Sequence, residues 1–187
     1  GHWFGVQNSY PIWHFVLEDR YLRRNPHVPS PGPKHVMTGS NPPVYPVSGG
    51  QKRYHSFNQA GRFTSACAAA PYLDTLLFGG GQEIHSFTCE PVHNVVQHMI
   101  VEDDGASFQA HRAESGSQPD FFASEDRWCR PVMTRTGPDG ALWIADMYRY
   151  MIEHPEYLTP DGRVELKPFY RLGDDRGRRR EDACHPP

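Results

Sequence analysis

The clearest hydrophobic pattern in the chain is a pair of apolar segments on either side of a short turn. The segments are 130–136 (RPVMTRT) and 141–147 (ALWIADM), and residues 137–140 (GPDG) lie between them. Proline fixes one turn dihedral, aspartate can bind its own backbone, and glycine allows a positive φ, so the pattern predicts a β-hairpin. The apolar run 143–145 is typical of a strand buried on both faces, which favours stacked sheets.

Short apolar segments separated by turn residues recur along most of the chain. Residues 3–17 predict two strands around a turn at 8–11, and 18–24 predicts one helical turn before Asn25-Pro26. Residues 26–53 contain seven prolines and predict a long irregular loop. Alternating apolar residues then predict further strands, over 63–69, 83–90, 92–103 and 106–113.

Composition and charge exclude several classes of protein. The net charge of −3 gives no reason to expect nucleic acid as a partner. No stretch approaches the roughly 18 apolar residues of a membrane span. The chain begins with Gly-His-Trp and has no leader pattern, so we expect it to be a segment of a longer protein. The arginine cluster from Arg176 to Arg180 is flanked by acidic residues and is expected to be a solvated tail.

The four cysteines do not have zinc-ligand spacing. Cys67 ends one predicted strand and Cys89 lies in another, so a cross-strand disulfide is possible if these strands are neighbours. The alternative is a pair of small buried thiols. Near the C-terminus, Cys184-His185 lacks the first cysteine of the CxxCH haem-attachment motif, so haem is not expected in this chain. The histidines form no HExxH or HxH spacing, and no metal-ligating residues are predicted from them.

Seven segments in order carry a resemblance to a known family. The chain resembles the membrane-bound dehydrogenase domain of planctomycete and verrucomicrobial haem-binding proteins, which is related to the soluble quinoprotein glucose and sorbosone dehydrogenases. The segments are WFGVQNSYPIWHFVLEDRYLRRNPHV (3–28), FTSAC (63–67), CEPVHNVV (89–96), RWCRPV (127–132), GPDGALWIADMYR (137–149), IEHPEYL (152–158) and GDDRGR (173–178).

The resemblance implies an all-β fold, a partial six-bladed β-propeller of about two to three blades with a long irregular loop. It places the propeller domain at 1–178, with 26–53 as the loop. In the family, GDDRGR continues into an apolar strand, whereas this chain continues into RRREDACHPP. Residues 179–187 are therefore expected to be a disordered or altered tail. The resemblance also implies a periplasmic or secreted location.

The same resemblance implies a cofactor site. Arg130 occupies the position of an arginine that contacts the anionic quinone PQQ in those dehydrogenases, and its guanidinium suits carboxylate binding. Trp128 replaces a second arginine and could stack on a planar ring. The loop 89–94 departs from the family where a lysine is expected, and it supplies His93 as a candidate catalytic base and Glu90 and Asn94 as candidate cofactor ligands. Calcium is possible as a second cofactor.

Two functions follow from these residues. The first is part of a sugar or alcohol dehydrogenase that transfers hydride to the quinone and passes electrons to a haem domain outside this chain, such as a c-type cytochrome domain. The second is a non-catalytic propeller that binds a carbohydrate or a protein partner. Each candidate residue also has a structural alternative. Arg130 can pair with Asp126 or Asp146, and His93 and Asn94 can stabilise a turn.

Overall fold

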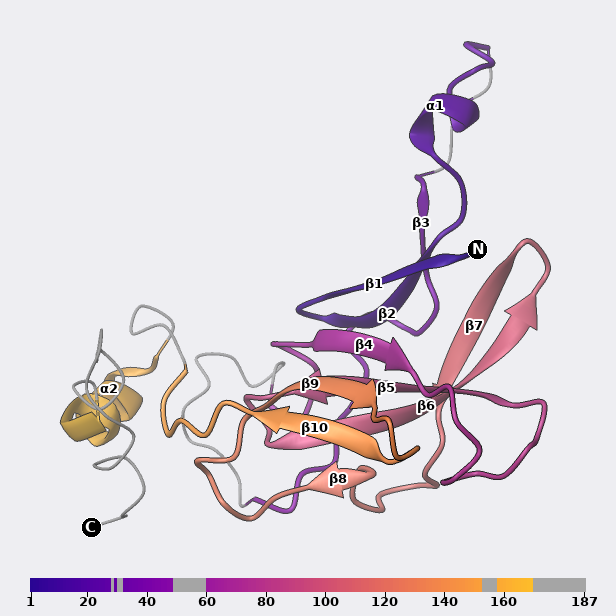
Figure 1. The fold of residues 1–187 in the computed structure, drawn as a ribbon. Helices are drawn as coiled ribbons and strands as arrows, with labels where there is room; N and C mark the ends of the chain where they lie inside the picture. The colour runs from indigo at the N-terminus through magenta and orange to yellow at the C-terminus, as the bar shows by residue number, and fades with distance from the viewer. Residues whose placement is uncertain (28, 30–31, 49–59, 153–157, 170–187) are drawn as a thin grey trace.

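The computed structural model describes residues 1–27, 29, 32–48, 60–152 and 158–169. It is all-β, with three sheets and short helices (Figure 1). The first sheet has the order β1-β2-β3, and the central sheet has the order β4-β5-β6-β7, with β8 paired to β6. The third sheet is the hairpin β9-β10. The strands are β1 (Trp3–Gln7), β2 (Tyr10–Phe15), β3 (Lys34–Val36), β4 (Cys67–Pro71), β5 (Ile84–Glu90), β6 (Val95–Asp104), β7 (Ser107–Arg112), β8 (Phe122–Ala123), β9 (Pro131–Thr136) and β10 (Leu142–Asp146).

The central sheet is covered on both faces. Along β6, successive side chains point to opposite faces. Val95 and Met99 pack with Ile12 of β2 in one buried cluster. Val96 packs in a second cluster, which includes Phe87 and is covered by the inward side chains of β10. The core therefore consists of two apolar layers, one on each side of the central sheet.

The predicted hairpin is confirmed. The strands β9 and β10 are antiparallel, with Leu142 opposite Thr136. The turn is closed by a hydrogen bond from the Gly137 amide to the Ala141 carbonyl (2.8 Å), and Gly140 has a φ of +78°. The expectation that both faces are buried is wrong for this hairpin, because Trp143 is 57% exposed on its outer face.

The strand predicted from Phe63 begins four residues later, at Cys67. The amides of Thr64 and Ser65 both donate to the side chain of Glu90 and are therefore not used in the sheet. The expected irregular loop contains a short strand, β3, paired with β2. The sheet pairing of this strand depends on a distant segment, which local composition does not reveal.

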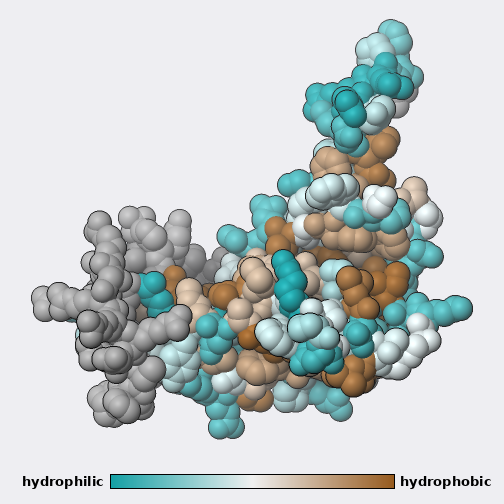
Figure 2. All heavy atoms as spheres, in the orientation of Figure 1, coloured by the Kyte–Doolittle hydropathy of each residue, from teal (hydrophilic) through white to brown (hydrophobic). Residues whose placement is uncertain are grey.

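Two parts lie away from the sheets. The connection between β2 and β3 projects from the body and carries α1 (Asp19–Leu22), in agreement with the predicted helical turn (Figure 1). Its tip is mostly hydrophilic (Figure 2). The helix α2 (Pro160–Leu166) is capped by Thr159, whose hydroxyl accepts from the Gly162 amide, and the 3-10 helix η2 (Lys167–Phe169) follows it.

No helix within the described parts of the chain is long and apolar enough to cross a membrane. The expected tail at 179–187 and the Cys184-His185 pair lie outside the described residues. So do residues 153–157 of the segment 152–158, which carries part of the resemblance.

Candidate ligand-binding site

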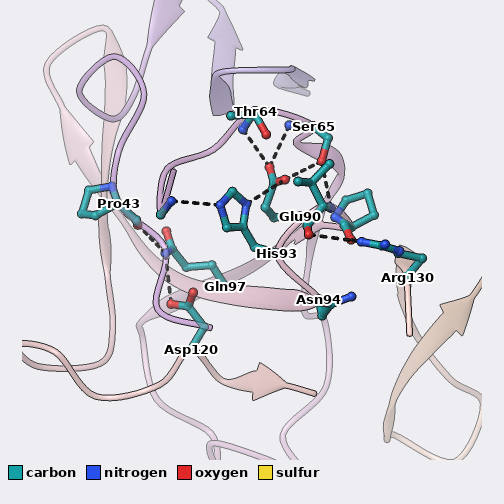
Figure 3. Close-up of polar contacts among 12 residues, drawn as sticks. Pro43, Thr64, Ser65, Glu90, His93, Asn94, Gln97, Asp120 and Arg130 are labelled. Carbon is teal, nitrogen blue, oxygen red and sulfur yellow. Dashed lines mark hydrogen bonds and ion pairs between the residues drawn. The ribbon is translucent and has the colours of Figure 1, made fainter. Parts of the chain in front are cut away.

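The turn between β5 and β6 meets the residues that precede β9. The side-chain amide of Asn94 donates to the Cys129 carbonyl. The guanidinium of Arg130 donates to the carbonyl oxygens of Pro91 (2.8 Å) and Val92 (3.1 Å). These bonds bring the candidate residues of the turn, which include Glu90 and His93, close to Arg130 (Figure 3).

Arg130 is completely buried and binds backbone carbonyls. Besides its two bonds to the turn, its Nε donates to the Arg149 carbonyl (2.8 Å) and its Nη2 to the Tyr150 carbonyl. The rigid, planar fork of arginine can serve several such acceptors at once. The side chain therefore ties the β5–β6 turn to the segment after β10. The alternative prediction was that Arg130 pairs with Asp126 or Asp146. Asp146 does bind Arg130, but it accepts from the backbone amide (2.7 Å) rather than from the guanidinium.

Glu90 is also completely buried, at the end of β5. Its Oε2 accepts from the backbone amides of Thr64 (3.0 Å) and Ser65 (2.9 Å), and its Oε1 accepts from the Ser65 hydroxyl. The Val92 amide in turn donates to that hydroxyl (3.2 Å). Because a buried carboxyl group without partners would be costly, these bonds account for its position. They hold the segment before β4 against the turn.

His93 is 2% exposed and bonded at both ring nitrogens (Figure 3). Its Nδ1 lies 3.3 Å from Glu90 Oε1, and its Nε2 accepts from the Gly61 amide (3.0 Å). An imidazole that accepts at Nε2 and donates at Nδ1 is neutral. The ring therefore joins Gly61 to Glu90, and the nitrogen that a catalytic base needs already accepts a hydrogen bond from the Gly61 backbone amide.

Asn94 closes the turn in a left-handed conformation, with a φ of +61°. Asparagine adopts this region more readily than most residues with a Cβ atom. Its side chain bonds the Cys129 carbonyl, and its own carbonyl accepts from the Ser124 amide (3.0 Å). The residue is fully buried and links three segments of chain.

Trp128 lies in a cluster of aromatic rings next to Arg130. Its ring stacks on Tyr148, with 5.9 Å between centroids and 28° between planes, and is tilted against Tyr150 at 5.6 Å. The Arg149 amide donates to the Trp128 carbonyl (2.8 Å) and fixes the two segments together. Tyr148 is 41% exposed. The cluster therefore presents an aromatic face at the surface.

Asp146 binds the backbone of Tyr148, which has an unusual conformation. Tyr148 has a φ of +47°, a rare conformation for a bulky residue that costs on the order of 1–3 kcal/mol. The Asp146 Oδ1 accepts from the Tyr148 amide (2.8 Å) as well as from the Arg130 amide. One carboxyl oxygen thus positions both the aromatic face and the buried arginine. The sequence indicated Asp146 only as a possible partner of Arg130. It did not indicate the two tyrosines, although the MYRY pattern directly after a strand could have done so.

A second buried network lies beside the turn. Gln97 Nε2 donates to the Pro43 carbonyl and to Asp120 (both 3.1 Å), and Arg112 Nε donates to the same Asp120 oxygen (2.7 Å). The guanidinium of Arg112 also stacks over the Tyr45 ring at 4.2 Å. This network anchors the segment around Pro43 to the central sheet. The sequence did not indicate it, because its members come from four separate segments.

The arrangement of these residues does not fit an anionic quinone at Arg130, since carbonyl oxygens occupy the fork that would bind its carboxylates. Among the described residues, no group of three or more His, Cys, Asp or Glu side chains could hold a metal ion such as calcium. What the site offers instead is the aromatic face of Trp128 and the two tyrosines, built on a rigid network of buried polar side chains.

Comparison with known proteins identifies one family. Residues 1–179 match the family model described as Domain of unknown function (DUF7133). No curated protein and no solved structure matches the chain. Since the family model spans nearly the whole sequence, the chain belongs to the DUF7133 family.

Proposed function

We propose that this domain binds a carbohydrate on the aromatic face formed by Trp128, Tyr148 and Tyr150, without catalysing a reaction itself. The observation that carries the proposal is the stacking of Trp128 on the exposed Tyr148. The C–H-rich face of a sugar ring packs well on aromatic side chains, while a few polar groups beside them bind the hydroxyls.

A polar group without a partner in the described parts of the chain belongs to the residue between the two tyrosines. The Nε of Arg149 is buried and has no hydrogen-bond partner among the described residues. A buried donor without an acceptor costs about 1–3 kcal/mol. The backbone amide of the same residue donates to the Trp128 carbonyl (2.8 Å), so Arg149 belongs to the segment that carries the two tyrosines.

The buried polar residues support binding rather than catalysis. A general base must accept a proton from the substrate, yet His93 Nε2 already accepts from the Gly61 amide. Glu90 is bonded to Thr64 and Ser65, and Arg130 to backbone carbonyls. In this proposal, these side chains hold the loops that carry the aromatic face.

The binding domain would be part of a β-propeller. The antiparallel order β4-β5-β6-β7 suits one four-stranded blade, and the sheets on its two faces suit parts of the neighbouring blades. A periplasmic or secreted location belongs to the same proposal and is supported by the sequence resemblance.

A dehydrogenase is the second candidate function. It is favoured by the meeting of Glu90, His93, Asn94, Trp128 and Arg130, which the resemblance selects from separate segments. In that function the domain would oxidise a sugar or alcohol with bound PQQ and pass electrons to a haem domain outside the chain. Arg130 would have to exchange a carbonyl partner for the cofactor.

Binding can be tested by calorimetry with a panel of neutral mono- and oligosaccharides. We expect Trp128→Ala to weaken the binding of the best ligand by at least about tenfold, which corresponds to about 1.4 kcal/mol. The matched control is Trp143→Ala, which removes an exposed tryptophan from the outer face of β10 and should leave affinity unchanged. Equal losses in both variants, or no binding by any sugar, would contradict the proposal.

The second candidate is tested separately by adding PQQ and calcium and measuring reduction of a dye acceptor with the same sugars. Turnover that requires added PQQ, and that Arg130→Lys reduces under conditions where this variant remains folded, would support the dehydrogenase. Sugar binding without turnover would support the binding domain.

A further inference from the structure

Cys67 and Cys89 lie directly opposite each other on β4 and β5. Opposed residues in antiparallel strands have Cα atoms about 4.5 or 5.5 Å apart, and disulfides usually span about 4.4–6.8 Å. The predicted proximity of the two strands is therefore confirmed. Both cysteines are free thiols in the structure, and they lie close enough for each to shift the pKa of the other. The Cys67 thiol donates to the Val132 carbonyl of β9 (3.5 Å). A bond between them requires no rearrangement of the strands.

The two thiols have different surroundings. Cys89 is completely buried, whereas Cys67 is partly exposed. The hydrogen bond from Cys89 lowers the pKa of Cys67, and burial opposes this effect. The same hydrogen bond, together with burial, raises the pKa of Cys89. Since the thiolate is the nucleophile in thiol chemistry, Cys67 is the reactive member of the pair.

The backbone at Cys67 is also irregular. β4 is the edge strand of the central sheet, and its pairing with β5 is interrupted between Cys67 and Ala70. Ala68, the next residue, has a φ of +52°. Irregularities of this kind at sheet edges re-aim side chains or end the regular pairing.

We propose that Cys67 and Cys89 form a thiol–disulfide exchange site that reacts with a low-molecular-weight disulfide such as glutathione disulfide. The Cys67 thiolate attacks one sulfur of the external disulfide, forms a mixed disulfide and releases one glutathione thiolate. Cys89 then loses its proton, attacks the Cys67 sulfur and releases the second glutathione thiolate. The protein dithiol is oxidised by two electrons, the external disulfide is reduced to two thiols, and the two protons pass to them.

The exchange site adjoins the candidate ligand site. Glu90 follows Cys89 directly, and its side chain bonds the amides of Thr64 and Ser65, shortly before Cys67. A Cys67–Cys89 disulfide would add a covalent link between two segments that these hydrogen bonds already join. The inference stands on the cysteine geometry and does not depend on the proposed function.

The test uses the full chain with Cys129→Ser and Cys184→Ser, so that only the proposed pair remains. After incubation with glutathione disulfide, we expect maleimide labelling and intact mass to show the loss of both thiols without a retained glutathione. Dithiothreitol should restore both. In the same background, Cys89→Ala should keep one glutathione on Cys67, and Cys67→Ala should gain none on Cys89.

Two results would overturn the proposal. One is that both thiols survive glutathione disulfide in the folded protein while the urea-unfolded protein reacts. The other is an adduct that forms first on Cys89. If either alanine variant fails to fold by circular dichroism, peptide mapping of the parent protein at early times still identifies the first cysteine to react.

Discussion

Arg130 Nη1 lies 2.8 Å from the carbonyl oxygen of Pro91 and so fastens the β5–β6 turn to the residue that precedes β9. The same guanidinium reaches the carbonyls of Arg149 and Tyr150 beyond β10. One buried side chain thus joins three segments that are distant in sequence, and the aromatic face of Trp128 and Tyr148 is built on two of them.

Arg130→Lys should therefore destabilise the fold. Lysine keeps the charge but lacks the planar fork, so several buried carbonyls lose their donor. We expect the free energy of unfolding in urea to fall by roughly 2–4 kcal/mol, because unsatisfied buried polar groups cost about 1–3 kcal/mol each and the site can partly relax. Arg135→Lys, at an exposed position on β9, is the control and should be neutral.

A cofactor-binding role for Arg130 makes the opposite prediction. In that case Arg130→Lys would leave unfolding in urea unchanged and reduce only the affinity for PQQ. Measuring stability and affinity in the same preparation separates the two roles.

Substitutions of Asn94 should separate its conformation from its hydrogen bond. Asn94→Gly removes the bond to the Cys129 carbonyl but accepts a φ of +61° without strain. Asn94→Ala loses the same bond and adds the cost of a left-handed alanine, about 1 kcal/mol or more. The free energy of unfolding in urea should therefore be highest for the native protein, lower for Asn94→Gly and lowest for Asn94→Ala. A glycine variant less stable than the alanine variant would show that the backbone conformation is unimportant.

The sequence predicts those parts of the fold that local residues determine. The hairpin β9-β10 is one example, because Gly137 to Gly140 specify its turn whatever surrounds it. The start of β4 could not be predicted, because Thr64 and Ser65 are withdrawn from the sheet by Glu90, more than twenty residues away. The exposure of Trp143 likewise depends on which sheet covers the hairpin.

The candidate site was predicted in part. The resemblance selected Arg130 and the turn that contains His93, and the structure brings them together. Their partners could not be predicted, because Arg130 binds backbone carbonyls and His93 binds a backbone amide. Backbone groups exist at every position, so the sequence carries no sign of which ones a buried side chain will meet.

Asp146 should act on sugar binding through Tyr148. Asp146→Ala removes the acceptor for the Tyr148 and Arg130 amides, so the strained tyrosine backbone can relax and the aromatic face is lost. We expect about tenfold weaker carbohydrate binding and a loss of about 1–2 kcal/mol in stability. Asp146→Asn keeps an acceptor oxygen and should restore most of the affinity. If both variants bind alike, or affinity is unchanged in Asp146→Ala, Asp146 does not position the site.

The imidazole of His98 should make the stability of the fold depend on pH. This side chain is buried, packs against the rings of Phe78 (4.7 Å between centroids) and Phe87 (4.8 Å), and has a pKa of about 4, lowered mainly by burial and then by His85. In the unfolded chain its pKa is about 6.5. The unfolded state therefore binds more protons between these values, and stability must fall as the pH decreases from about 6.5 to about 4.

The titratable groups around His98 also affect how stability changes with pH. His85 Nδ1 lies 3.0 Å from His98 Nε2, Glu83 is 4.0 Å from His85 Nε2, and Glu114 Oε1 is 3.7 Å from His98 Nδ1. Burial raises the pKa of Glu114, so protonation of Glu114 favours the folded state and opposes the effect of His98 at the acidic end of the range.

The stability lost through His98 should be at most about 3 kcal/mol, since one pKa unit corresponds to about 1.4 kcal/mol. Urea unfolding at intervals between about pH 4 and pH 7.5 measures the slope. His98→Phe keeps an aromatic ring in the stack and removes the titrating group, so its stability should depend less on pH, with the remaining dependence reversed in sign if Glu114 dominates it. Identical slopes in the two proteins would mean that His98 is not buried as a neutral imidazole, and that the stack with Phe78 and Phe87 opens before the protein unfolds.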